Sequence, residues 1–123
     1  VLKENGLYVA LASSKPQELC EHILQVYCLR HYFDRVIGET DNHAKLGKPE
    51  MIRRALPEHY RRAAMVGDRL YTDVACGVNA GIDSIFVLSG EGVMGDIVKY
   101  CVNPTWVYQD IAKLYHDLKE NRI

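Results

Sequence analysis

Short runs of apolar residues alternate with amphipathic segments along most of the chain. A run that is apolar on both faces is typical of a strand buried inside a parallel sheet. These runs predict strands over residues 7–12, 33–38, 63–67 and 85–88, with a weaker one over 105–108. Between them, apolar residues at helical spacing predict helices over 16–29, 49–56, 72–81 and 109–119. The alternation predicts an α/β fold in which a parallel sheet carries helices on both faces.

Proline, glycine and serine residues mark where these helices begin and end. Pro16 suits a first helical position, and Ser14 is a candidate N-cap two residues earlier. A polar loop precedes Pro49, which opens the second helix, and Pro57 closes it. Gly81 suits the C-terminal end of the third helix.

The composition predicts one globular domain spanning residues 1–123. Apolar residues make up 48% of the chain and charged residues 25%, so a sizeable core can form. The net charge of -1 argues against a nucleic-acid or anionic-membrane partner, because such partners select a concentrated basic surface. No apolar run approaches the roughly 18 residues of a membrane-spanning helix.

The four cysteines predict a reducing environment. Cys20, Cys28, Cys76 and Cys101 form no C-x-x-C pair and no zinc-like group with histidine. Each lies in or beside an apolar segment, and we expect all four to be small buried hydrophobes. A reduced cytoplasmic protein is the simplest interpretation.

Residues suited to phosphate chemistry follow three of the predicted strands. Ser13 and Ser14 follow the first strand, and Lys48 lies in the loop after the second. Asp68 and Asp73 follow the third, in the stretch GDRLYTD. Ligands of open parallel sheets bind beyond the carboxyl ends of the strands. Hydroxyl donors, a fixed cation and Mg²⁺-binding carboxylates are what phosphoryl transfer from a monoester requires.

Each of these residues also has an ordinary structural explanation. The serines suit a turn or a cap, and Lys48 could be a surface lysine. Asp73 could be a first-turn acid favoured by the helix dipole. Asp68 is harder to explain in this way, because an acid beside a buried strand is costly unless it is used. Their order, each at the end of a strand, favours a shared function.

Three motifs make the chain similar to the haloacid-dehalogenase (HAD) superfamily. LASS resembles its second motif at Ser13, LGKPEMI the lysine motif at Lys48, and GDRLYTD the acidic fourth motif at Asp68 and Asp73. ALASSKP, YFDRVIGE and MVGDRLYTDVACGVNAGI resemble the phosphoglycolate-phosphatase-like branch in particular. The tail, with IFVLSG and PTWVYQDIAKL, also resembles the sugar-phosphate and nitrophenylphosphatase-like branch.

The resemblance implies a Rossmann-like core and a role for each residue. Ser13 is expected to bind the transferring phosphoryl group, helped by backbone N–H groups near Ser14. Lys48 is expected to hold the phosphate beside the nucleophile, and Asp68 and Asp73 to hold Mg²⁺. The implied activity is that of a Mg²⁺-dependent phosphatase acting on a small phosphorylated metabolite, of the phosphoglycolate or sugar-phosphate type, through an aspartyl-phosphate.

The chain departs from the family pattern at the first motif, the Asp-x-Asp nucleophile. The twelve residues before Ser13 contain no Asp, so we expect the nucleophile strand upstream of Val1. We therefore expect the chain to be the C-terminal part of one HAD-like core and to be inactive alone, because it lacks its nucleophile. The 34 residues between Ser13 and Lys48 leave no room for a cap domain, which we also expect upstream.

Other functions remain open. A phosphomutase or a dehalogenase could use the same fold, although retention of both Asp68 and Asp73 favours phosphoryl chemistry over dehalogenation. A catalytically silent structural or interaction fragment is a further alternative, which the missing first motif supports. The sheet edge left uncovered by the missing strand predicts self-association.

Overall fold

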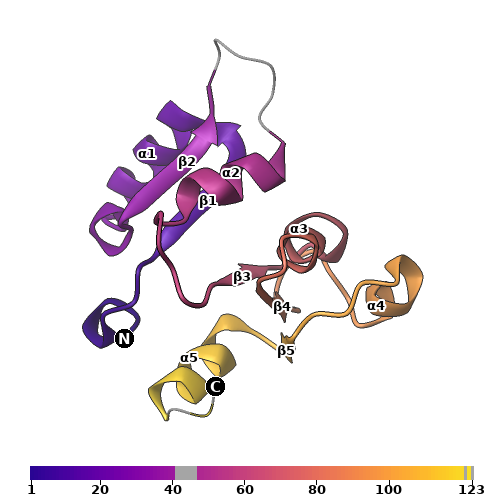
Figure 1. Cartoon of the computed structure of the whole chain (residues 1–123). Helices are drawn as coiled ribbons and strands as arrows, with labels where there is room; N and C mark the ends of the chain where they lie inside the picture. Colours follow the sequence, from indigo (N-terminus) through magenta and orange to yellow (C-terminus); the bar gives the residue numbers. More distant parts are fainter. Residues whose placement is uncertain (41–46, 121, 123) are drawn as a thin grey trace. The chain divides into compact units, whose positions relative to one another are not determined.

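The chain forms two compact units, Val1–Tyr60 and Arg61–Ile123, in a computed structural model (Figure 1). The structure describes residues 1–40, 47–120 and 122, and each unit is described by itself. The polar loop expected before Pro49 includes residues 41–46 and falls outside the described residues. The assignment of both units to one core domain stays a prediction.

The first unit is built on two parallel strands, β1 (Ala10–Pro16) and β2 (Arg35–Glu39), joined through helix α1 (Gln17–Val26). Two single 3-10 turns, η1 (Lys3–Asn5) and η2 (Arg30–Tyr32), precede β1 and β2 respectively. Helix α2 (Lys48–Ala55) packs against both strands. The buried cluster beneath α1 consists of Cys20, Leu24 and Val36, with Leu11 and Phe33 packed against it.

The pairing of β1 with β2 changes at the carboxyl end of β1. Ala12 lies opposite Ile37, but Pro16 lies opposite Glu39, so four steps along β1 match two along β2. Beside this shift, the side chain of Gln17 forms hydrogen bonds to backbone groups of β2 that a regularly paired strand would otherwise form. Its amide nitrogen donates to the Val36 carbonyl at 3.1 Å, and its Oε1 accepts from the Gly38 N–H at 2.6 Å. The side chain of Gln17 therefore satisfies backbone groups of β2 where the register of β1 shifts.

The second unit contains three parallel strands in the order β3 (Ala64–Gly67), β4 (Asp83–Val87) and β5 (Trp106–Tyr108). Alternate residues of β4 point to opposite faces of the sheet. Ile85 and Val87 pack with Tyr108 and Leu114, the latter from helix α5 (Ile111–Lys119). Phe86 packs on the other face with two fully buried residues, Leu70 and Val74.

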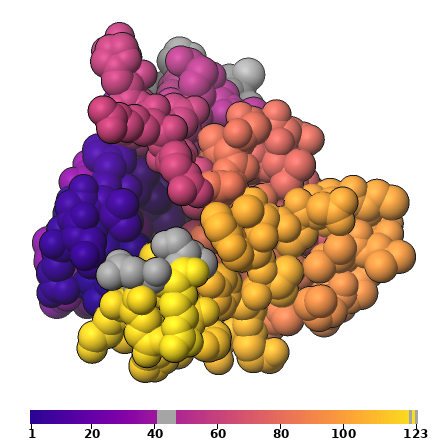
Figure 2. All heavy atoms as spheres, turned by 60° about the horizontal axis from the view of Figure 1, so that its bottom comes forward, coloured from indigo at the N-terminus to yellow at the C-terminus, as the bar shows by residue number. Residues whose placement is uncertain are grey.

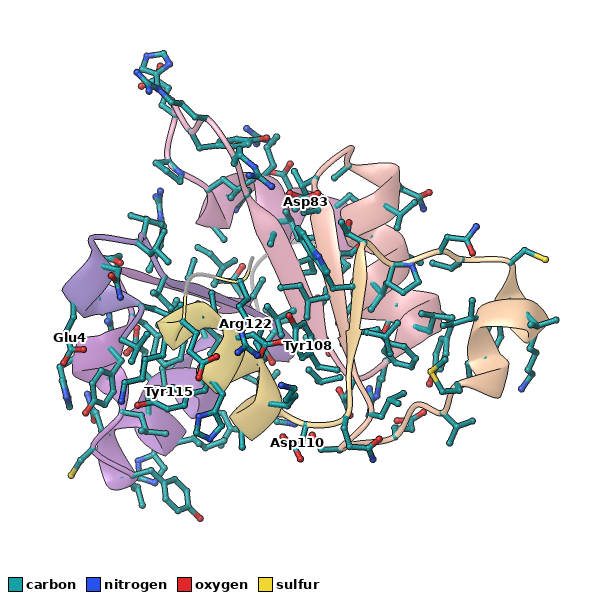
Figure 3. All side chains as sticks on the ribbon, turned by 90° about the horizontal axis from the view of Figure 1, so that it is seen from below. Glu4, Asp83, Tyr108, Asp110, Tyr115 and Arg122 are labelled. Atoms are coloured by element: carbon teal, nitrogen blue, oxygen red, sulfur yellow. The ribbon has the colours of Figure 1, made fainter. Side chains whose placement is uncertain are left out.

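The remaining helices of this unit follow the first two strands. Between β3 and β4 the chain forms η3 (Leu70–Val74), a single π-type turn, and then the short helix α3 (Ala75–Asn79). Helix α4 (Gly95–Tyr100) follows β4. Figure 3 shows Asp83, which starts β4, and Asp110, which follows β5, at opposite ends of this sheet. Each parallel strand therefore delivers its carboxyl end to the same edge.

These elements confirm the predicted α/β class and its parallel pairing, with shifts at the boundaries. The first strand begins at Ala10 instead of Leu7, because β2 offers no partner before Arg35. Ser14 is not an N-cap: β1 continues to Pro16, which itself precedes α1 and has no capping side chain. Helix α4 was not expected from the sequence. Among the described residues, no helix is long and apolar enough to cross a membrane.

The expectation that all four cysteines are buried is wrong for two of them. Cys20 is buried and Cys76 half-buried, but Cys28 and Cys101 are exposed. Both exposed cysteines adopt the left-handed conformation, with φ of 55° and 52°. Each lies at the end of a helix. The backbone conformation required there, and not packing of the thiol into the core, determines where each side chain lies.

Cys28 closes α1 with the hydrogen bonds of a Schellman motif. Its N–H donates to the Gln25 carbonyl at 3.0 Å, and the N–H of Leu29 donates to the Leu24 carbonyl at 2.7 Å. This position favours glycine, because a Cβ atom in the left-handed region costs about 1–2 kcal/mol.

Replacing Cys28 with glycine should therefore stabilise the chain. We expect Cys28→Gly to raise the free energy of unfolding by about 0.5–1 kcal/mol, part of the relief being offset by the entropy of glycine in the unfolded state. Urea denaturation measures the change. Cys28→Ser keeps the Cβ atom and should shift the stability by less than about 0.5 kcal/mol. Equal stabilities for the two variants would contradict the assignment of strain to this residue.

Candidate functional site

The carboxyl end of β1 holds the predicted hydroxyl residues. Ser13 is half-buried and Ser14 exposed, and both lie where the pairing with β2 shifts. The hydroxyl of Ser13 accepts a hydrogen bond from the N–H of Lys15 at 3.2 Å, which fixes the turn out of the sheet. The structure thus places Ser13 at the predicted edge, within the strand and not beyond it.

Lys48 reaches the same end of β1. It is the first residue of α2, directly after the N-cap position of Gly47, and not part of the preceding loop as expected. Its Nζ donates to the carbonyl oxygen of Ala12 at 3.1 Å. Since Ala12 directly precedes Ser13, the structure places the ammonium group of the predicted lysine beside the backbone that adjoins the predicted hydroxyl residue, within the first unit. Pro49 in the first turn of α2 restrains the backbone from which Lys48 projects.

The two predicted acids both lie near the carboxyl end of β3. Asp68 follows the strand directly, and Asp73 belongs to the π-type turn η3. The N–H of Asp73 donates to the carbonyl of Arg69 at 3.0 Å, which folds the turn back toward the strand. A Cβ atom added to Gly67 would lie 3.0 Å from Oδ2 of Asp73 and would overlap its Cβ. Asp73 therefore packs against the residue that precedes Asp68, and glycine permits this approach.

A segment that was not predicted from the sequence contacts Asp68 closely. The loop after β4 contains Gly90, Glu91 and Gly92, and the N–H of Glu91 donates to Oδ2 of Asp68 at 2.9 Å. The N–H of Gly92 donates to the backbone carbonyl of Asp68 at 2.9 Å. A Cβ atom on Gly90 would overlap the carboxylate of Asp68. In the sequence, the feature that could have indicated this segment is the pair of glycines on either side of Glu91, shortly after the apolar run of β4.

Glu91 also binds the acidic loop, defined here as residues 68–73, through its side chain. Oε2 accepts from Nε of Arg69 and Oε1 from the hydroxyl of Tyr71, both at 2.6 Å. The hydrogen bond from Tyr71, followed by that from Arg69, lowers the pKa of the Glu91 carboxyl group. The hydrogen bond between Tyr71 and Glu91 also raises the pKa of the Tyr71 phenol. Glu91 is therefore an anion at neutral pH and accepts from two protonated donors.

The pair of carboxylates suits a hard divalent cation. Mg²⁺ commonly binds through one or two carboxylates together with water and substrate phosphates, not inside a complete protein cage. Within the described residues, no group of three or more His, Cys, Asp or Glu side chains could form such a cage. Asp68 and Asp73 fit the smaller requirement, because both are half-buried oxygen donors at one end of a strand.

Comparisons with known proteins place this arrangement in context. The HAD-hydrolase-like family model matches residues 45–114. Ribonucleotide monophosphatase NagD of Escherichia coli K12 is 38% identical over 84 residues, covering 66% of this chain and 34% of NagD. A protein designated pyrophosphatase PpaX, of Caldanaerobacter subterraneus, is 34% identical over 119 residues, covering 91% of this chain and 54% of PpaX.

A solved structure is similar across nearly the whole chain. The crystal structure of a predicted phosphatase from Clostridium acetobutylicum matches with a TM-score of 0.81 and 27% identity, covering 97% of this chain and 55% of that one. The chain thus spans about half the length of these proteins, or less.

The close approach of Gly90 to Asp68 generates a test of the site geometry. Gly90→Ala should destabilise the chain by about 1–3 kcal/mol, because the added methyl group cannot share space with the carboxylate. Gly95→Ala is the matched control, since its Cβ atom would meet nothing within 4 Å. Its effect should stay within about 1 kcal/mol, on the stabilising side, as expected for glycine to alanine in a helix. Thermal and urea unfolding would compare the two, and equal stabilities would contradict the geometry.

Proposed function

Because the chain belongs to the HAD-hydrolase-like family, we propose that it forms part of a Mg²⁺-dependent phosphatase acting on small phosphate monoesters. The observation that carries the proposal is the placement of Asp68 and Asp73 at the carboxyl end of β3, where a family member would bind its metal ion. Within the first unit, the contact of Lys48 with the carbonyl oxygen directly before Ser13 also supports it.

In this proposal each residue has one task. The hydroxyl of Ser13 donates to an oxygen of the phosphoryl group, and backbone N–H groups near Ser14 add donors. The ammonium group of Lys48 offsets the repulsion between the phosphate and an attacking carboxylate. Asp68 and Asp73 hold Mg²⁺, which supplies positive charge that neutralises phosphate oxygens.

The attacking carboxylate comes from a segment outside residues 1–123, because no Asp precedes Ser13. Its attack forms a bond from a carboxylate oxygen to phosphorus as the bond from phosphorus to the leaving oxygen breaks, and a general acid that also lies outside residues 1–123 donates a proton to the departing alcohol. Water then attacks the phosphorus, which releases inorganic phosphate and regenerates the carboxylate. A cap domain outside the chain is part of the same proposal.

The substrate is a small phosphorylated metabolite, of the phosphoglycolate or sugar-phosphate type. The names of NagD and PpaX, a ribonucleotide monophosphatase and a pyrophosphatase, both specify small phosphorylated substrates and support that coarser class. Phosphomutase and dehalogenase chemistry and a silent interaction fragment are the competing hypotheses. A cytoplasmic location is also a prediction.

The activity can be tested on the complete protein that contains this chain. We expect hydrolysis of 4-nitrophenyl phosphate in Mg²⁺, its loss in EDTA, and at least a roughly 100-fold lower kcat/KM for Asp68→Asn. Glu120→Gln is a control at an exposed acid paired with Arg122 and should leave the rate unchanged. Unchanged turnover in Asp68→Asn would contradict the site, and absence of hydrolysis would favour the silent fragment.

We further propose that the isolated chain self-associates through β3. Among the described residues β3 pairs with β4 alone, and its Val66 side chain is 42% exposed. An uncovered apolar strand favours pairing with another chain.

Sedimentation velocity should therefore show concentration-dependent association of the isolated chain. Val66→Lys should weaken it, because a charge on an edge strand opposes pairing. Val98→Lys is the control, since Val98 is 82% exposed but lies in α4. A strictly monomeric wild-type chain would contradict the proposal.

A further inference from the structure

Glu91 contacts the acidic loop from both its backbone and its side chain. Its N–H donates to Oδ2 of Asp68 at 2.9 Å, while its carboxylate accepts from Arg69 and Tyr71, each at 2.6 Å. The three partners are all members of residues 68–73. One residue outside the loop thus joins the carboxylate of Asp68 to the two side chains that follow it.

The neighbouring glycines make this contact close. Gly90 and Gly92 each approach Asp68 so tightly that a Cβ atom would overlap its carboxylate or its carbonyl oxygen. Glu91 is therefore the one residue of this triplet that can carry a side chain to the loop. Gly92 is buried, and its N–H donates to the Asp68 carbonyl at 2.9 Å, so the loop after β4 is anchored on Asp68 at two points.

Folding stability is a weak explanation for this arrangement. The side chains of Arg69 and Glu91 are 52% and 48% exposed, and exposed ion pairs contribute little to stability. The segment that carries Glu91, orange in Figure 2, lies at the surface of the second unit. The contacts affect the orientation of the Asp68 carboxylate more than they affect stability. The N–H of Glu91 holds one carboxylate oxygen of Asp68 and thereby fixes the direction of the other.

Orientation matters for the proposed metal ligand. Mg²⁺ requires nearly ideal octahedral geometry, so a carboxylate free to rotate binds it less well than one held in place. Groups that hold a ligand by hydrogen bonds typically change metal affinity or activity by 10–100-fold when removed. We infer that Glu91 is a positioning residue that orients the carboxylate of Asp68 for Mg²⁺, an inference that rests on the proposed function.

The first test measures the Mg²⁺ dependence of hydrolysis by the complete protein. Glu91→Ala removes both side-chain acceptors and should raise the Mg²⁺ concentration for half-maximal rate about tenfold. Glu91→Gln retains an acceptor for Tyr71 and should give a smaller rise. At saturating Mg²⁺, the KM for 4-nitrophenyl phosphate should stay within about twofold of the wild type, since Glu91 acts through Asp68.

A matched control separates positioning from the general loss of an ion pair. Arg62→Gln removes the pair between Arg62 and Asp83, at the amino end of β4 in the same unit. It should leave the Mg²⁺ dependence unchanged. A half-saturating Mg²⁺ concentration for Glu91→Ala within twofold of the wild type, or a rise of the same size in Arg62→Gln, would overturn the inference.

The second test does not depend on activity. Hydrogen exchange of the Glu91 and Gly92 amides, both bonded to Asp68, should be about tenfold faster in Glu91→Ala and unchanged in Arg62→Gln. If the wild-type protein hydrolyses no phosphate ester, the proposed function fails and this exchange decides the positioning role alone. Unchanged exchange in an inactive protein, or equally faster exchange in both variants, would overturn the inference.

Discussion

Parallel strand pairing determines where chemistry can occur in each unit, because it delivers every carboxyl end of a sheet to one edge. In the first unit this brings Lys48 of α2 to the backbone of β1, next to Ser13. In the second unit it brings the loop after β4 to Asp68, which follows β3. Antiparallel pairing would have placed the ends of β3 and β4 at opposite edges.

The fold class, and the positions of the candidate residues near the carboxyl ends of strands, could be predicted because both depend on short-range patterns. Strands are visible as short apolar runs, and Asp68 is conspicuous as an acid directly after one of them. Glu91 could not be identified in this way. Its role depends on an N–H group and two exposed partners that only tertiary pairing of β3 with β4 brings near.

Local backbone geometry explains the other differences from expectation. Cys28 and Cys101 lie beside apolar segments, yet both are exposed, because each ends a helix in the left-handed conformation. Ser14 has the residue type of an N-cap, but the strand continues past it to Pro16. Helix α4 has six residues and no buried one, so no apolar stripe marks it in the sequence.

Three of the predicted site residues form hydrogen bonds with backbone atoms. Lys48 donates to a carbonyl oxygen, Ser13 accepts from an N–H, and Asp68 accepts from another. Such contacts use backbone groups, whose presence does not depend on which side chain a position carries. Glycines at positions 67, 90 and 92 make the close approaches possible, since a Cβ atom at each would overlap an atom of Asp68 or Asp73. The glycines around the two acids are therefore a structural requirement of this arrangement, whereas the exposed charges nearby are not.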